Sequence, residues 1–272
     1  MGEPTNQQIE SGMGTTQDYR LAYQFMQRAA EIYAACLRQQ PAAMGYLRGR
    51  GFTDATIRAF ELGYAPRNDD VVRKALCAAP DAAYKVKLAC EVGLVSRTDD
   101  ATYRDFLHDR VTFPIRWLDA KGKFRVVAFG ARTLREGAKC KYLNSKTNFI
   151  YRKSVTLYGL DRAYADILGT GTVVLVEGYT DCIAAHQGGV RNVVAAAGTA
   201  FTDGCAHMLA MYARTARVVM DPDKAGLNGG TKAVEALRRA GVDASVVVLP
   251  DGLDPDEFIG ERGAGEFRRL LA

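Results

Sequence analysis

The sequence predicts an α/β fold, in which a mostly parallel β-sheet flanked by helices follows an α+β subdomain of basic character. From about residue 155, apolar runs of strand length alternate with helical segments, which is typical of a parallel sheet covered on both faces. Before that point the chain carries a hairpin pattern and more basic than acidic side chains. These observations divide the chain into three parts: a disordered lead (1–17), an α+β subdomain (18–154) and an α/β domain (155–272).

Length and composition fit one or two globular domains. The chain has 272 residues, of which 48% are hydrophobic, enough to bury a core. No apolar run approaches the roughly 20 residues that cross a bilayer, and the polar N-terminus lacks the pattern of a signal peptide. We therefore expect a cytoplasmic protein without a membrane partner. The net charge of +5 is by itself only weak support for nucleic-acid binding.

The first half is predicted to begin with an amphipathic helix at 18–38, where apolar residues recur at three- and four-residue spacings. A second helical pattern covers 69–79. Two runs rich in β-branched and aromatic residues, joined by the turn sequence DAKG, predict a β-hairpin at 110–118 and 123–134. The basic stretch at 139–154 is predicted to be a loop.

The second half alternates regularly between strand and helix patterns. The first three apolar runs are each followed by a segment with helical periodicity, as in consecutive βαβ units. The predicted strands are 172–177, 192–198, 217–221 and 244–250, and the predicted helices are 180–187, 202–214 and 229–240.

The six cysteines are scattered and form no CxxC pair. This spacing fits neither a zinc site nor a disulfide framework, so we expect no zinc in this chain and reduced, mostly buried thiols. The three histidines are also far apart in sequence, which disfavours a histidine-based metal site.

Acidic residues end or follow three of the four predicted strands. Glu177 ends the first strand, Asp221 ends the third with Asp223 two residues later, and Asp254 comes after the fourth. The carboxyl ends of parallel strands lie at one edge of a sheet, where ligands bind. Like charges held together are unfavourable unless a cation neutralises them, and an all-oxygen set favours Mg²⁺ or Mn²⁺.

A single aspartate after a strand is more often a helix N-cap than a ligand. Asp181 and Asp203 fit a capping role, and Asp251 beside a glycine fits a turn. Glutamate is a poor N-cap, so Glu177 is the least easily explained in this way. The coincidence of several acids at one edge favours a metal site over capping alone.

Ordered motifs give the sequence a family resemblance. The succession VEGYTD, AAGTA, DPDKAGLNGG and LPDGLDPDEF resembles the TOPRIM domain of bacterial DnaG-type primases. Earlier motifs, YLRGRGFTDATIRAFELGYAP, RVTFPIRWLDAKGKFRVVAFGARTL, KYLNS and RKSVTLYGLDRA, resemble the preceding part of the primase RNA-polymerase domain. The resemblance covers about residues 20–270. It implies a DNA-directed RNA polymerase that makes short primers from ribonucleoside triphosphates on single-stranded DNA in replication.

The resemblance also implies roles for individual residues. Glu177, Asp221 and Asp223 match the catalytic acids, and with Asp254 they match the metal ligands, Glu177 as a ligand or a proton acceptor. Asp181 and Asp256 match further acids of the same cluster. Basic and polar positions in the family motifs imply contacts with nucleotide or nucleic acid at six residues: Arg50, Arg132, Lys141, Tyr142, Asn144 and Lys153. A lone basic residue on a surface is usually only solvated. A binding role is favoured for Lys141 because it lies in a concentrated basic loop, and for Arg132 because it lies at a strand end. The binding role of Arg50 depends on the resemblance alone. Gly198 and Thr199 either shape a nucleotide pocket or turn the chain.

The chain also departs from the family pattern. Its cysteine spacing excludes the zinc-binding module of whole primases. We also expect the later helical region and the helicase-binding region of the family to be absent. The resemblance implies a replicative helicase as a partner, bound through that absent region. Two alternatives remain: DNA cleavage of the TOPRIM nuclease or topoisomerase type, and a non-catalytic module that binds single-stranded DNA.

Overall fold

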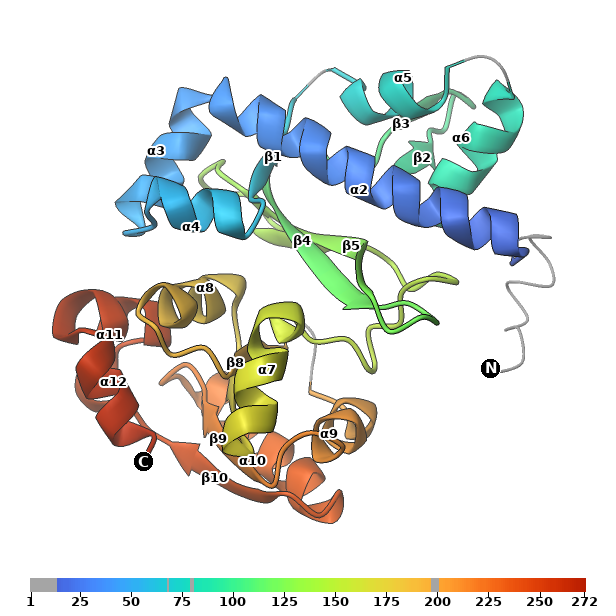
Figure 1. The fold of residues 1–272 in the computed structure, drawn as a ribbon. Coiled ribbons are helices and arrows are strands. Elements are labelled where there is room, and N and C mark those ends of the chain that lie inside the picture. The colour runs from blue at the N-terminus through green and yellow to red at the C-terminus, as the bar shows by residue number, and fades with distance from the viewer. Residues whose placement is uncertain (1–13, 68, 79–80, 197–200) are drawn as a thin grey trace. The chain divides into compact units, whose positions relative to one another are not determined.

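The chain folds into two compact units. The computed structural model describes residues 14–67, 69–78, 81–196 and 201–272. The first unit combines the chain up to Arg48 with Ile57–Arg152, and the second combines Gly49–Thr56 with Lys153–Ala272 (Figure 1). The second unit therefore corresponds to the predicted α/β domain, except that it also takes a short segment from the first half of the sequence.

Helix α2 (Thr16–Arg38) begins two residues earlier than expected. Thr15 is its N-cap: the Thr15 hydroxyl accepts a hydrogen bond from the Asp18 N–H at 3.1 Å, and the Asp18 carboxylate accepts one from the Thr15 N–H at 2.9 Å. This reciprocal capping box fixes the first turn. The prediction that the disordered lead extends through residue 17 is therefore wrong for Thr16 and Gln17, and its first thirteen residues lie outside the described chain.

An antiparallel sheet packs against α2. Its strand order is β1-β4-β5-β6, formed by β1 (Gly63–Ala65), β4 (Arg110–Leu118), β5 (Phe124–Thr133) and β6 (Tyr142–Asn144). Strands β4 and β5 are the predicted hairpin. Gly63 is required where β1 meets α2, because a Cβ there would lie 2.5 Å from the Tyr33 Cβ. The prediction of loop at 139–154 is wrong at β6, which pairs with Gly130–Arg132 of β5 and so completes the backbone hydrogen bonds at that edge.

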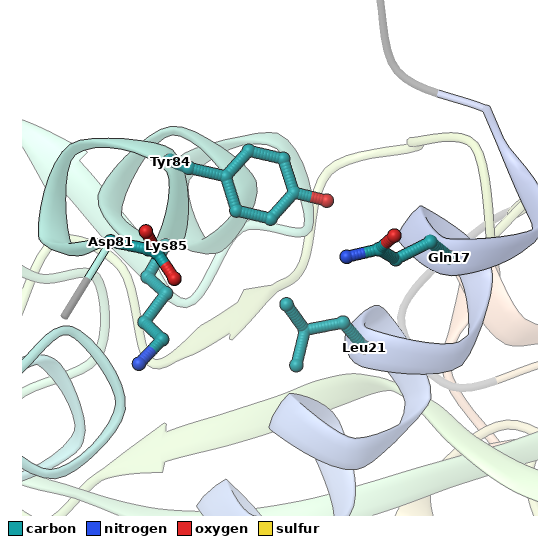
Figure 2. A pocket seen from close by; sticks show the side chains of 5 residues that line it. All are labelled: Gln17, Leu21, Asp81, Tyr84 and Lys85. Atoms are coloured by element: carbon teal, nitrogen blue, oxygen red, sulfur yellow. The ribbon is translucent and has the colours of Figure 1, made fainter.

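Smaller elements complete the first unit. Figure 2 shows a hollow between α2 and α6 (Ala82–Glu91), lined by Gln17 and Leu21 on one side and by Asp81, Tyr84 and Lys85 on the other. The Tyr84 hydroxyl donates a 2.5 Å hydrogen bond to Asp18 Oδ1 and so ties α6 to the start of α2. The remaining elements are α3 (Pro41–Gly49), α4 (Asp54–Ala59), α5 (Val71–Leu76), α6 (Ala82–Glu91), β2 (Val95–Arg97) and β3 (Tyr103–Asp105).

The second unit is built on a parallel sheet with strand order β10-β9-β7-β8. The strands are β7 (Thr172–Val176), β8 (Val193–Ala195), β9 (Thr215–Val219) and β10 (Asp243–Val247). Residues 173–176 of β7 are all buried, as expected for a central strand covered on both faces. Helices flank the sheet (Figure 1): α7 (Leu160–Thr170), α8 (Tyr179–Gln187), α9 (Asp203–Ala210) and α10 (Lys224–Arg239).

The chain continues beyond β10 through η1 (Pro250–Gly252), α11 (Pro255–Arg262) and α12 (Ala264–Leu270). Asp251 has a φ of 65° beside Gly252, which confirms its interpretation as a turn residue. Among the described residues, none of the helices has the length and apolar content needed to cross a membrane. The six cysteines carry free thiols; Cys77, Cys182 and Cys205 are buried and Cys140 is exposed.

Candidate functional site

Acidic side chains gather near the carboxyl ends of the parallel strands, as predicted. Glu177 follows β7 directly, and Asp221 comes two residues after the end of β9. Asp181 lies in the first turn of α8, and Asp256 in the first turn of α11. Parallel pairing of β7 with β9 brings these strand ends to the same edge of the sheet.

The tightest acidic group consists of Asp181, Asp254 and Asp256. Each offers a carboxylate oxygen, and the three oxygens lie within 4.8 Å of one another. Two backbone hydrogen bonds hold Asp181: its Oδ2 accepts from the Gly178 N–H at 2.9 Å, and its Oδ1 accepts from the Asp256 N–H at 3.3 Å. Asp254 is the N-cap of α11. We call these three residues the inner acidic group.

Glu177, Asp221 and Asp223 form a neighbouring outer acidic group. The Asp221 N–H donates a 3.1 Å hydrogen bond to Glu177 Oε1, which joins the ends of β7 and β9. Asp223 is the N-cap of α10, and its Oδ1 accepts a 2.7 Å hydrogen bond from the Gly226 N–H. A Cβ at Gly226 would lie 2.3 Å from the Asp221 carbonyl oxygen and 2.6 Å from Glu177 Oε1. Only glycine therefore lets the start of α10 pack this closely to both acids.

The two acidic groups share one electrostatic environment. Burial and then the charges of Asp223 and Asp256 raise the pKa of Asp221. Burial and then the charge of Asp221 raise the pKa of Glu177. For Asp181, burial followed by the charges of Asp256, Asp221 and Asp254 raises the pKa well above its usual range. Burial and contact with Asp256 raise the pKa of Asp254 to about 7. These shifts record repulsion between carboxylates in a partly buried site.

Arg50 supplies a cation to the inner acidic group. Its Nη1 forms an ion pair with Asp256 Oδ2; the Arg50 side chain is 29% exposed and that of Asp256 only 4%. Within the described chain, Asp256 Oδ1 is buried and has no hydrogen-bond donor. The structure thus places Arg50, which sequence reasoning assigned to phosphate contact, beside an acid of the cluster.

These residues fit a divalent cation. The donors are all carboxylate oxygens, the set that hard cations prefer. The buried Asp256 Oδ1 has an unused lone pair, and an ion would relieve the repulsion that raises the four pKa values. The cluster is therefore suited to bind a divalent metal ion, as the resemblance to the TOPRIM domain implies.

In the first unit, Arg132 lies between two tyrosines. Its guanidinium carbon is 4.7 Å from the centre of the Tyr46 ring and 5.6 Å from that of Tyr142. Arg132 on β5 and Tyr142 on β6 are direct cross-strand partners. Stacking of this kind holds a guanidinium in place without neutralising its charge. Arg132 thus remains a fixed cation that can meet a phosphate.

The other predicted contact residues are Lys141, directly before β6, Tyr142 and Asn144 on β6, and Lys153 after it. Lys141 is exposed, and its carbonyl oxygen accepts hydrogen bonds from the Thr133 N–H and from Arg110 Nη1, both at 3.0 Å. Asn144 pairs with Gly130, and Lys153 is half-buried at the start of the second unit. The predictions for Gly198 and Thr199 lie outside the described residues.

Sequence reasoning missed two supporting contacts. Tyr46 stacks on Arg132 from helix α3, and Gln187 at the end of α8 holds the segment that carries Arg50 through hydrogen bonds to Gly51 and Thr53. Both contacts join residues far apart in sequence, and neither residue stands out locally. No signal in a single sequence identifies such pairs.

Two protein-family models match most of the chain. The family described as the DNA primase catalytic core, N-terminal domain, matches residues 32–164, and the Toprim-like family matches residues 174–259. The first range ends within the second unit, and the second range contains all six residues of the inner and outer acidic groups.

Known proteins with both parts are similar over nearly the whole chain. A DNA primase of Clostridium acetobutylicum is 38% identical over 93% of this chain and 41% of its own length. A solved DNA primase domain from Pseudomonas aeruginosa is 35% identical, with a TM-score of 0.83 over 92% of this chain and 78% of that one. A DnaG primase catalytic domain solved bound to single-stranded DNA is 31% identical, with a TM-score of 0.80 over 94% and 82% of the two chains.

The chain spans less than half the length of the first curated relatives. Against solved catalytic domains, however, it covers about four-fifths of the partner at above 30% identity. The sheet order, the acids at its edge and the preceding basic hairpin all lie within the matched region. The chain therefore belongs to the family of bacterial DnaG-type DNA primases and matches their catalytic core.

Proposed function

We propose that this chain is the polymerase core of a DNA primase, which synthesises short RNA primers from ribonucleoside triphosphates on a single-stranded DNA template during replication. The observation that carries the proposal is the convergence of six acids at one edge of the parallel sheet, three of them with oxygens within 4.8 Å of one another. Nucleotidyl transfer of this type uses divalent ions held by carboxylates.

The proposed metal ligands come from both acidic groups. Glu177, Asp221, Asp223 and Asp254 are our assignment, with Asp181 and Asp256 as further members, and we propose Mg²⁺ or Mn²⁺ as the ion. When bound, such an ion activates the primer 3′ hydroxyl and offsets the charge of the triphosphate. Glu177 is suited to accept a proton, because its raised pKa brings it closer to neutral pH.

The proposed nucleotide and template contacts lie mainly in the first unit. Arg132 and Lys141 would bind triphosphate or template phosphates, and Tyr142 is 38% exposed, enough to stack on a base. Asn144 and Lys153 complete the proposed set. The related catalytic domain that was solved with single-stranded DNA supports a template of that kind.

We also propose a replicative helicase as a partner of the longer primase in which such a core functions, and a cytoplasmic location, where template and nucleotides are available. The proposed partner has no assigned contact on this chain.

Primer synthesis can be tested directly. The protein is incubated with single-stranded DNA, labelled ribonucleoside triphosphates and either Mg²⁺, Mn²⁺ or EDTA, and the products are separated by length. We expect labelled oligoribonucleotides with either ion and none with EDTA. Cut DNA would instead indicate a Toprim nuclease, and template binding with no product would indicate a binding module.

A further inference from the structure

The segment Gly49–Thr56 belongs to the second unit although it lies in the first half of the sequence. The Gln187 side-chain amide holds it at two points: Gln187 Nε2 donates to the Gly51 carbonyl at 2.8 Å, and Gln187 Oε1 accepts from the Thr53 N–H at 2.9 Å. Directly before the first of these points, Arg50 forms its ion pair with Asp256. The segment is therefore anchored so that one guanidinium reaches the inner acidic group.

This ion pair has an unusual setting. Asp256 is almost fully buried and lies in a group of three carboxylates whose ligand oxygens are within 4.8 Å of one another. Arg50 occupies only its Oδ2, and the buried Oδ1 has no donor among the described residues. Holding three carboxylates this close, two of them buried, is unfavourable without a nearby cation. Arg50 supplies that cation from within the chain while leaving one Asp256 oxygen unused.

We propose that Arg50 is the internal counter-cation of the inner acidic group, which keeps the site folded before a divalent ion arrives, and that Gln187 is the positioning residue that holds Arg50 there. This role differs from phosphate or template contact. This role rests on the metal site of the proposed function, but it concerns the stability of the folded protein in the absence of metal. It predicts that Arg50 and a divalent ion stabilise the same carboxylates and can partly replace each other.

Thermal unfolding with and without Mn²⁺, in the absence of template and nucleotides, tests this role. In EDTA, Arg50→Gln is expected to lower Tm by about 5 °C, because a buried carboxylate loses its partner. The increase in Tm caused by Mn²⁺ is expected to be larger in Arg50→Gln than in the wild type. Arg50→Lys keeps the charge, so its Mn²⁺-dependent increase should equal that of the wild type. Gln187→Ala should show the Arg50→Gln pattern to a smaller extent.

A second-site change separates charge compensation from general damage. The double variant Arg50→Gln with Asp256→Asn removes both partners, and its Tm in EDTA should return toward the wild-type value. If Arg50→Gln alone does not fold, this double variant decides: a folded protein supports the role and an unfolded one contradicts it. Arg58→Gln, the same substitution on the exposed side of α4, is the matched control and should leave both measurements unchanged.

The inference is overturned if Arg50→Gln has the wild-type Tm in EDTA and the wild-type response to Mn²⁺, or if Asp256→Asn fails to restore it. Weaker template binding by such a variant would then return Arg50 to phosphate contact. Failure of the proposed function looks different: Mn²⁺ would not raise the Tm of the wild type. In that case the EDTA measurements on the single and double variants still decide the role of Arg50.

Discussion

Two buried aspartates at the same helix position behave in opposite ways. Asp18 in the first unit and Asp181 in the second each lie in the first turn of a helix, and each accepts a 2.9 Å hydrogen bond from the backbone N–H three residues earlier. Their exposures are 3% and 5%. Nevertheless the pKa of Asp18 is lowered to about 2, whereas that of Asp181 is raised well above its usual range.

The difference comes from their neighbours. Burial raises the pKa of Asp18, but donors outweigh it: the hydroxyls of Tyr84 and Thr15, and the N–H groups of Thr15 and Gly14. Asp181 is surrounded instead by the carboxylates of Asp256, Asp221 and Asp254. The same capping geometry therefore stabilises the start of the helix at Asp18. At Asp181 it holds a carboxylate among other carboxylates, where a bound cation would be stabilised.

The largest expected effect tests the acidic side of this contrast. Asp221→Asn should reduce Mg²⁺-dependent primer synthesis by at least about 100-fold, because it removes a carboxylate that we assign to the metal and to charge stabilisation. Product yield per unit time is the measurement. Because the substitution also relieves repulsion with Asp223 and Asp256, Tm in EDTA should not fall.

Asp203→Asn is the control for this variant, since Asp203 is an exposed acid paired with Arg239 on the surface. It should retain wild-type synthesis. Wild-type synthesis by Asp221→Asn would exclude our assignment of the acidic site.

A matched pair of substitutions sharpens the contrast directly. Asp18→Asn should lower the free energy of unfolding by about 2 kcal/mol, because an amide cannot accept all the hydrogen bonds that the carboxylate receives. Asp181→Asn should raise it by about 1 kcal/mol in EDTA, because one of four repelling carboxylates becomes neutral. Urea unfolding of both variants in EDTA measures these changes. Equal destabilisation by both substitutions would show that capping, and not neighbouring charge, dominates at Asp181.

The alternation of apolar runs and helical segments predicted the parallel sheet and three helices of the second unit, but not α7, α11, α12 or the segment Gly49–Thr56. The four strands and three of the flanking helices lie where valine-rich runs and helical periodicity place them, and the hairpin Arg110–Leu118 with Phe124–Thr133 is confirmed. These elements are specified by local patterns of burial. Strand β6 was missed because it has only three residues within a basic stretch, and its pairing with β5 is not visible in its own sequence.

The site was predictable in part for the same reason. Acids that follow parallel strands can be expected to converge, and the structure brings Glu177 into contact with Asp221. In the sequence, helix capping and a shared metal site are competing interpretations, whereas Asp223 and Asp254 cap helices and also belong to the acidic groups. The sequence also did not reveal that Arg50 pairs with Asp256, because that contact joins positions more than two hundred residues apart.

The pH dependence of stability should have opposite signs at the two kinds of aspartate. The raised pKa of Asp254, about 7 against an ordinary value of 3.8, gives stability that is present below pH 3.8 and is lost as pH rises through 7. Since Asp254 is partly exposed, solvent screening reduces the effect to about 1 to 2 kcal/mol. The lowered pKa of Asp18 gives stability that is present above pH 3.8 and is lost as pH falls through about 2.

Asp254→Asn isolates the first of these effects, because asparagine still caps a helix. In EDTA, the wild type should lose stability relative to this variant between pH 4 and pH 8, and Mn²⁺ should remove the difference at pH 8. Chemical unfolding at several pH values measures it. A constant difference across this range would mean that Asp254 titrates normally in the folded protein.

The smallest expected effect concerns the basic strand edge of the first unit. Lys141 is exposed, and its contacts in the structure are made by its backbone carbonyl. Lys141→Ala should therefore leave Tm unchanged and raise the KM for ribonucleoside triphosphates by about 3- to 10-fold, as expected for one solvent-exposed phosphate contact. Lys139→Ala, a neighbouring exposed base, is the control.

If both variants keep the wild-type KM, the charge at Lys141 is only solvated. Recognition in the first unit must then depend on fixed cations such as Arg132, which two tyrosine rings hold in place. The contrast would then be between buried carboxylates that need a cation and a stacked guanidinium that needs an anion.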